Sequence, residues 1–182
     1  MENSCNNCIN FYIDKEYKNE TEIQNFNCGK YTSFNNYLKE KKYKEYKEDA
    51  KAVIHYVIDA ENEALIGYFS LAASAVFVGD KLAATIIPAI ELKMFAIDEK
   101  YQGKGLSGKI LGSMYDIVKY YAMNYVGAKM LVLYAIPETE DPIVVKMYKK
   151  SGFAEMELDS SMYRFKDDFN NQCVPMYKLI EL

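Results

Sequence analysis

The chain has 182 residues, of which 50% are hydrophobic and 26% charged, with a formal net charge of -4. These values predict one globular domain with a sizeable core over residues 1–182, with residues 1–8 as a loose tail. Among the 22 basic residues only Arg164 is an arginine. This acidic balance disfavours extended nucleic-acid binding but leaves room for a local lysine patch.

The sequence also disfavours a membrane-spanning protein and a secreted one. No apolar run approaches the roughly 18 residues that a membrane helix needs, and the N-terminus has no basic region followed by an apolar one. We therefore expect a cytoplasmic protein that does not contact a membrane. Cys5 and Cys8 form one C-x-x-C pair without the second pair that a zinc site needs, so no bound metal is expected.

The periodicity of the sequence predicts strands over 9–13, 51–59, 64–76, 92–97, 129–136, 153–158 and 175–180, and helices over 31–48, 105–124 and 143–150. Residues 14–30 and 77–89 are expected to be irregular connections, the latter with some helical or extended content. The only histidine, His55, alternates with apolar residues along a strand, which favours a packed or half-exposed side chain. This order predicts an α/β (α+β) fold with a mixed central sheet of six or seven strands flanked by helices.

One stretch, Glu91 to Leu111, combines an apolar strand, a polar turn with glycines and a helical pattern. Glycines let the backbone approach a ligand closely, and the first N–H groups of a helix bind anions. Residues 103–108 match G-x-G-x-x-G, but four residues separate the strand from the glycines and no acid ends the next strand. A dinucleotide site is therefore disfavoured, and the P-loop pattern fails because no Gly-Lys-Ser/Thr closes the turn.

The same residues, Gln102-Gly-Lys-Gly-Leu-Ser107, resemble the Q/R-x-x-G-x-G/A turn of the GCN5-related N-acetyltransferase (GNAT) family, with Ser107 at a position usually Gly or Ala. Tyr148-Lys-Lys-Ser-Gly-Phe153 resembles that family's closing Y-x-x-x-G-F signature. The likeness covers most of the chain. It implies a GNAT-like domain that transfers an acetyl group from acetyl-CoA to a primary amine by direct attack.

The resemblance also implies where acetyl-CoA binds. Backbone amides of the glycine turn would hold the pyrophosphate, and the strand before it would pair with the pantetheine amides. Asp141 stands where many members of the family carry an asparagine that contacts the cofactor. The residues expected at the cofactor are Phe95, Ala96, Ile97, Gln102, Gly103, Lys104, Gly105, Leu106, Ser107 and Asp141.

Acetyl transfer needs a deprotonated amine, a polarised thioester carbonyl and a proton for the leaving thiolate. By resemblance Tyr148 supplies that proton as a general acid; the alternative is a core tyrosine with a packing role. Glu91 stands five residues before Ala96, which is the placement of the general-base glutamate in the histone-acetyltransferase branch. The alternative for Glu91 is an acid in solvent at the end of a strand.

The N-terminal half is similar to the acetyltransferase toxins of toxin–antitoxin pairs. Phe26-Asn-Cys-Gly29 and Leu65-Ile-Gly-Tyr-Phe-Ser-Leu71 resemble their F-x-C-G and G-Y-(Y/F)-(T/S)-L segments. The similarity implies aminoacyl-tRNA as a candidate acceptor and an antitoxin as a candidate partner; a homodimer is a further candidate assembly. The acidic composition, and Glu91 in place of an apolar residue, stand against a toxin. The same fold also suits a non-catalytic acyl-CoA-binding regulatory module, or an acetyltransferase acting on a small-molecule or protein amine.

Overall fold

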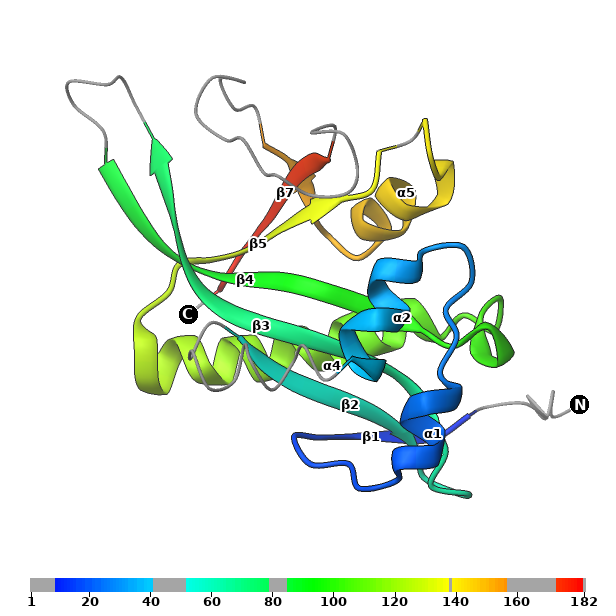
Figure 1. Cartoon of the computed structure of the whole chain (residues 1–182). Helices are drawn as coiled ribbons and strands as arrows, with labels where there is room; N and C mark the ends of the chain where they lie inside the picture. The colour runs from blue at the N-terminus through cyan, green and yellow to red at the C-terminus, as the bar shows by residue number, and fades with distance from the viewer. Residues whose placement is uncertain (1–8, 41–51, 79–84, 138, 157–172, 182) are drawn as a thin grey trace, which may run out of the picture. The chain divides into compact units, whose positions relative to one another are not determined.

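The structure, a computed structural model, describes residues 9–40, 52–78, 85–137, 139–156 and 173–181 (Figure 1). Its strands form one mixed sheet in the order β1-β2-β3-β4-β5-β7-β6. The predicted mixed sheet with accompanying helices is therefore confirmed. The chain divides into two compact units, which are residues 1–70 with 94–106 and residues 71–93 with 107–182. The strands β3 (Leu65–Val78) and β4 (Thr85–Ile97) each contribute residues to both units.

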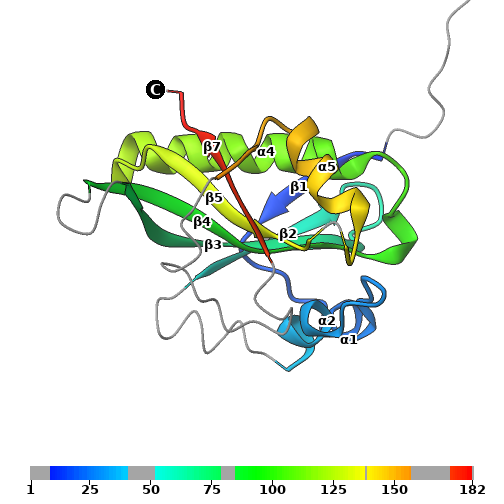
Figure 2. The same ribbon diagram turned by 90° about the horizontal axis from the view of Figure 1, so that it is seen from above.

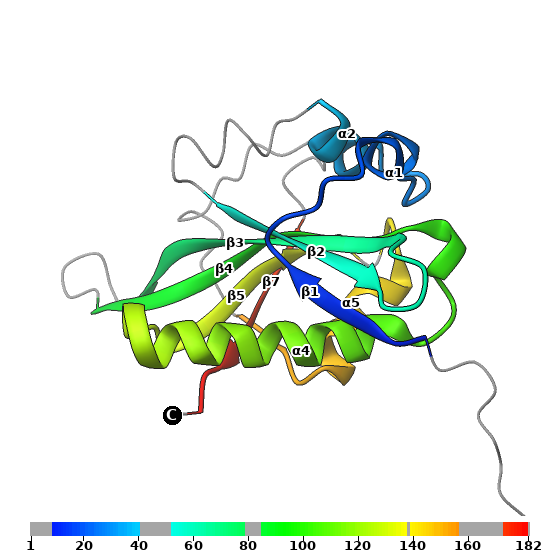
Figure 3. The same ribbon diagram turned by 90° about the horizontal axis from the view of Figure 1, so that it is seen from below.

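The first unit holds β1 (Phe11–Asp14), α1 (Glu20–Asn25), α2 (Thr32–Lys39) and β2 (Val53–Asp59). β1 pairs antiparallel with β2 along its whole length. Figure 3 shows α1 and α2 on one face of β2 and β3. The helices close one hydrophobic core there, whose largest fully buried members are Ile23, Phe26, Leu38, Ile58 and Tyr68.

The second unit holds nearly all of α4 (Leu106–Tyr121), then β5 (Met130–Ala135), α5 (Pro142–Lys150), β6 (Ala154–Glu155) and β7 (Val174–Leu179). Figure 2 shows α4 lying along one face of the strands of this unit. The helix continues as a π-helical turn, Ala122–Val126, and ends at Gly127, whose φ of 60° is left-handed. The predicted stop at Gly127 is confirmed, because glycine adopts this conformation without steric cost.

Two secondary-structure predictions were wrong. The helix α1 lies within residues 14–30, which were expected to be irregular. It is capped by the Asn19 side chain and buries only Ile23, so the sequence shows no apolar repeat that would predict it. β4 begins at Thr85 rather than Leu92. A proline within an apolar run normally argues against a strand, because proline has no N–H to donate to a neighbouring strand. Here the described pairing of β4 with β5 begins at Ala89, so Pro88 precedes it and its missing N–H breaks none of those hydrogen bonds.

Several predicted features lie outside the described residues. These are the Cys5–Cys8 pair, the second half of the helix expected over 31–48 with most of its lysines, and the end of the strand expected over 153–158. Within the described part of the chain, no helix is both long and apolar enough to cross a membrane.

His55 is packed, as predicted. Its side chain is 2% exposed and stacks on Phe69 with ring centroids 4.7 Å apart. Burial, assisted by the charge of Lys15, lowers the pKa of His55 from 6.5 to about 4. The native protein therefore keeps this ring neutral under conditions in which the unfolded chain protonates it.

We expect His55 to make folding stability depend on pH between 6.5 and 4. As the pH falls through this window the unfolded state binds a proton and the native state does not, so the free energy of unfolding decreases by about 3 kcal/mol. In His55→Leu, which has a similar volume, this decrease is absent. Urea unfolding of both proteins at about pH 7, 5.5 and 4 measures the difference; parallel pH curves would contradict the burial of the ring.

Candidate functional site

The glycine turn connects β4 to α4. Asp98 begins it by capping the short 3-10 helix Glu99–Tyr101, its carboxylate accepting from the Lys100 N–H at 3.0 Å. Gly103 and Gly105 follow with φ values of 73° and 71°. A side chain in this left-handed region costs roughly 1–2 kcal/mol. A Cβ at either glycine would meet no atom within 4 Å, so the turn requires glycine for its backbone conformation and leaves open space beside it.

The N-terminus of α4 follows this turn directly. The first N–H groups of a helix have no acceptor within the helix, and the aligned peptide dipoles make this end positive. No acidic residue lies in the first turn of α4. Lys104 is exposed, with its Nζ 5.2 Å from the centroid of the Tyr101 ring. Residues 103–107 therefore form an electropositive turn suited to an anion such as a pyrophosphate.

A hydrogen-bond network fixes the form of the turn. The Gln102 side-chain amide donates to the carbonyls of Ile97 at 2.8 Å and Cys28 at 3.2 Å. The Asn27 N–H donates to the Asp98 carboxylate at 3.0 Å, and the Glu99 N–H donates to the Asn27 carbonyl at 2.8 Å. Both Gln102 donors are engaged within the protein, so this side chain acts by holding the turn in place.

Asn35 of α2 completes this network and was missed by the sequence reasoning. It is 8% exposed, accepts from the Cys28 N–H at 2.8 Å and donates to the Asn27 side chain at 3.2 Å. The sequence offers one signal for the role of Asn35, which is a polar residue next to the apolar repeat of α2. Burial raises the pKa of the Cys28 thiol to about 11, so this cysteine is a packed thiol near neutral pH.

The Leu65–Leu71 segment also meets the turn within the first unit. The Asp98 N–H donates to the Ile66 carbonyl at 2.8 Å. A Cβ at Gly67 would lie 2.4 Å from the Ala96 carbonyl oxygen, so only glycine permits this approach of the two backbones. The buried Tyr68 hydroxyl donates to the Phe34 carbonyl at 2.7 Å. Both segments that resemble the toxins are therefore tied to residues 96–102.

β4 and β5 pair in parallel from Ala89↔Met130 to Leu92↔Leu133. Over the described residues this register ends at Leu92, whereas β4 continues to Ile97 and β5 to Ala135. The predicted cofactor residues Phe95, Ala96 and Ile97 therefore lie beyond the paired stretch. Backbone groups of a strand beyond its partner are available to an extended ligand.

The Tyr148–Phe153 signature is the C-terminus of α5. The Phe153 N–H donates to the Tyr148 carbonyl at 3.1 Å, and the Gly152 N–H donates to the Lys149 carbonyl at 3.0 Å. Gly152 has a φ of 86°. This is a Schellman motif, and the aromatic rings of Tyr148 and Phe153, 5.6 Å apart, supply its hydrophobic contact. The motif therefore orients Tyr148 relative to the end of its own helix.

The Tyr148 side chain is 7% exposed. Its hydroxyl has no hydrogen-bond partner in the part of the chain that the structure describes. Burial raises the pKa of Tyr148 above its usual value, so the hydroxyl stays protonated throughout the neutral range. The site therefore holds a protonated donor that no described residue engages.

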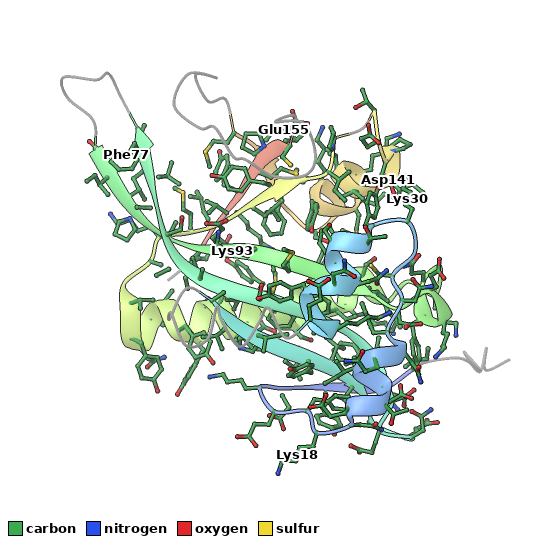
Figure 4. The ribbon with its side chains drawn as sticks, viewed as in Figure 1. Lys18, Lys30, Phe77, Lys93, Asp141 and Glu155 are labelled. Atoms are coloured by element: carbon green, nitrogen blue, oxygen red, sulfur yellow. The ribbon has the colours of Figure 1, made fainter. Side chains whose placement is uncertain are left out.

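The N-terminus of α5 explains Asp141. This residue is the N-cap and accepts from the Ile143 N–H at 3.1 Å, with Pro142 in the first turn as predicted (Figure 4). Its carboxylate thus has a structural role at a position where the family pattern carries a cofactor contact. The exposed residues Lys146, Lys149 and Lys150 follow on the same helix, and Lys149 forms an ion pair with Glu155 at 2.6 Å.

Lys178 of β7 supports the end of α5. Its Nζ donates to the Ser151 carbonyl at 3.0 Å and lies 4.0 Å from the centroid of the Tyr115 ring. A Cβ added at Gly152 would come within 3.3 Å of the same Nζ. A cation at the C-terminus of a helix is favourable because the helix dipole is negative there. Lys178 was not singled out from the sequence, where it is one of many lysines.

Glu91 lies in the middle of β4, opposite Val132 of β5, and is 8% exposed. Its carboxylate is 3.2 Å from the Nζ of Lys93, which lies on the same strand (Figure 4). The alternative of a solvent-exposed acid at a strand end was therefore wrong. Glu91 and Tyr148 both belong to the second unit, and no hydrogen bond joins them among the described residues.

No protein-family model and no curated protein matches the sequence. Solved structures do match. The chain is similar to a tyrosine-to-phenylalanine variant of the toxin AtaT bound to the C-terminus of the antitoxin AtaR and acetyl-CoA, with a TM-score of 0.68, 18% identity and 93% of each chain covered. It is also similar to the KacTA–DNA complex, with a TM-score of 0.67 and 19% identity over 94% of each chain.

A third structure, AtaT complexed with acetyl-methionyl-tRNAfMet, matches with a TM-score of 0.65 and 17% identity over 93% of this chain and 95% of that one. At these identities the likeness establishes the fold. It confirms the GNAT-like fold expected from the two glycine motifs.

We expect the Lys178 contacts to stabilise the second unit. Lys178→Met keeps most of the aliphatic stem but removes the hydrogen bond to Ser151 and the cation–π contact with Tyr115, so it should lower the free energy of unfolding by about 1–2 kcal/mol. Lys129→Met, at an exposed position of the same unit, should stay within about 0.5 kcal/mol of wild type. Chemical denaturation measures both; equal effects of the two substitutions would show that Lys178 does not support α5.

Proposed function

We propose that this protein is an acetyl-CoA-dependent N-acetyltransferase of the toxin type, with the amino group of aminoacyl-tRNA as its acceptor. The observation that carries the proposal is the fold, shared over almost the whole chain with AtaT. That protein has been solved with acetyl-CoA and with acetyl-methionyl-tRNAfMet. An antitoxin as partner and a cytoplasmic location, where both substrates occur, belong to the same proposal.

The glycine turn supports acetyl-CoA as the acyl donor. Backbone N–H groups of Gly103 to Ser107 bind the pyrophosphate at the positive end of α4, and the network around Gln102 and Asp98 holds them in position before the ligand arrives. The stretch of β4 from Phe95 to Ile97, which lies beyond the register with β5, pairs with the pantetheine amides through its backbone. Lys104 adds positive charge at the edge of the turn.

The reaction is a direct transfer. The acceptor nitrogen attacks the thioester carbonyl carbon, and collapse of the tetrahedral intermediate breaks the C–S bond. Tyr148 donates its hydroxyl proton to the departing thiolate, a role that fits a buried phenol whose raised pKa keeps it protonated. Before this attack, Glu91 takes a proton from the acceptor ammonium through a water molecule, which leaves a neutral amine as the nucleophile. In this scheme both proton transfers use side chains that are almost entirely buried.

Two observations bear on the roles and the acceptor. Tyrosine-to-phenylalanine variants were made of both AtaT and KacT, which indicates a tyrosine of interest in each. In this chain, Lys146 and Lys150 are exposed on the helix that carries Tyr148, and Lys149 beside them forms an ion pair with Glu155. A short basic stretch suits the phosphates of an acceptor stem, even in a chain with a net charge of -4.

We expect Tyr148→Phe to lower kcat for acetyl transfer at least ~10²-fold, because the leaving thiolate loses its proton donor. The dissociation constant for acetyl-CoA should change by less than about threefold. Tyr177→Phe, a half-buried tyrosine of the same unit, should retain kcat. Rates are measured with aminoacyl-tRNA, polyamine, peptide and aminoglycoside acceptors. Wild-type protein that binds acetyl-CoA but acetylates none of them would instead be a non-catalytic acyl-CoA-binding module.

For Glu91 the test is the loss of its charge. Glu91→Gln should lower kcat by about 10²-fold while acetyl-CoA affinity and thermal stability stay near wild type. Glu155→Gln is the matched control, since it also removes a carboxylate that pairs with a lysine, but at a half-exposed site. A Glu91→Gln enzyme with wild-type kcat would show that Glu91 is a structural acid.

A further inference from the structure

Lys93 is the charged neighbour of Glu91 on β4. The Nζ atom of Lys93 lies 3.2 Å from the Oε1 atom of Glu91, and the two side chains are 34% and 10% exposed. Residues two apart on a strand point to the same face of the sheet, so these side chains meet without any distortion of the strand. The ion pair is therefore built into a single strand of the second unit and depends on no loop.

The Glu91 carboxylate borders on an apolar cluster. Val132 lies directly opposite Glu91 in the register of β4 with β5. Val132 belongs to a buried cluster that also contains Ala89, two residues before Glu91 on the same strand, and the half-buried Tyr177 packs against it. Moving a carboxylate from water into such surroundings is costly unless a counter-charge accompanies it. Lys93 supplies that counter-charge, so this pair differs from an ion pair on an open surface.

The pair stands where the register of β4 with β5 ends. The last described partners are Leu92 and Leu133, so Lys93 is the first residue of β4 beyond them (Figure 4). Two residues further along the chain begins the stretch of β4 that we propose pairs with acetyl-CoA. Its partial exposure leaves Lys93 within reach of solvent, whereas the carboxylate that it holds is almost buried.

The ion pair separates the two oxygens of the Glu91 carboxylate. Lys93 engages Oε1, and no residue in the described part of the chain engages Oε2. A free glutamate side chain samples several rotamers, and a base accepts a proton efficiently only when its oxygen points at the donor. The contact with Lys93 restricts these rotamers before the acceptor arrives.

We propose that Lys93 is the positioning residue of the general base. It holds Oε1 of Glu91 so that Oε2 receives the acceptor proton through the water molecule. The proposal rests on the proposed function, in which Glu91 is that base. It assigns Lys93 no contact with acetyl-CoA or with the acceptor, which separates its role from that of a lysine that binds phosphate.

Lys93→Met tests the proposal, because it keeps most of the aliphatic stem and removes the charge that holds Glu91. We expect kcat for acetyl transfer to fall about tenfold, since a misplaced base accepts the proton less often. KM for the acceptor and the dissociation constant for acetyl-CoA should stay within about twofold of wild type. Lys129→Met, which removes an exposed lysine of the same unit, should retain kcat. The acceptor is whichever of aminoacyl-tRNA, polyamine, peptide or aminoglycoside the wild type acetylates fastest.

Three further variants separate positioning from packing. Lys93→Arg restores a cation within reach of the carboxylate and should keep kcat within about threefold of wild type. Glu91→Gln leaves no carboxylate for Lys93 to hold, so adding Lys93→Met to it should change kcat by less than about twofold. Lys93→Gln keeps an N–H donor without the charge and should lower kcat about threefold, which repeats the comparison with a milder change. Thermal melting shows that each variant is folded.

The outcomes distinguish this proposal from the proposed function. Wild-type kcat in Lys93→Met, with a slow Glu91→Gln, would overturn the positioning role and leave the base in place. A raised KM at unchanged kcat would show that Lys93 binds the acceptor instead. Equal losses from Lys93→Met with and without the Glu91 carboxylate would show that it acts on another group, and either result overturns the proposal. Wild-type kcat in Glu91→Gln would remove the base itself, and the positioning role with it.

Discussion

The side chain of Gln102 donates to the carbonyls of Ile97 and Cys28, and this pair of hydrogen bonds connects three parts of the first unit. It joins the end of β4, the glycine turn and the segment that precedes α2. Asp98, Asn27 and Asn35 extend the same network with backbone and side-chain bonds. Because Gly103 and Gly105 adopt left-handed φ values, the turn depends on such neighbours to remain in a single form. The proposed pyrophosphate site is therefore a consequence of how the N-terminal segment packs.

In the second unit, too, hydrogen bonds and packing explain a sequence motif. The Tyr148–Phe153 signature is a helix-ending motif whose glycine has to be left-handed and whose two aromatic residues have to touch. Lys178 supports that end of the helix through the Ser151 carbonyl. The tyrosine that we assign to proton donation is thus positioned by main-chain geometry, which explains why residues that never meet a substrate belong to the signature.

The sequence predicted those features that depend on residues close together in the chain. The glycine turn, the stop at Gly127, Pro142 at the start of α5 and the packed His55 all follow from backbone preferences or from alternation along a strand. Asn35, Lys178 and the middle-of-strand position of Glu91 were not found, because each depends on contacts between residues distant in the sequence. α1 was missed because a six-residue helix with one buried side chain has no pattern.

In the proposed function, the fixed turn before α4 binds the pyrophosphate of acetyl-CoA. Hydrogen exchange of the wild type with and without saturating acetyl-CoA tests it directly, since bound anions protect the amides that hold them. We expect protection of the peptides that cover residues 102–108, with coenzyme A giving the same pattern. Tight binding of acetyl-CoA with no change of exchange in residues 102–108 would contradict it.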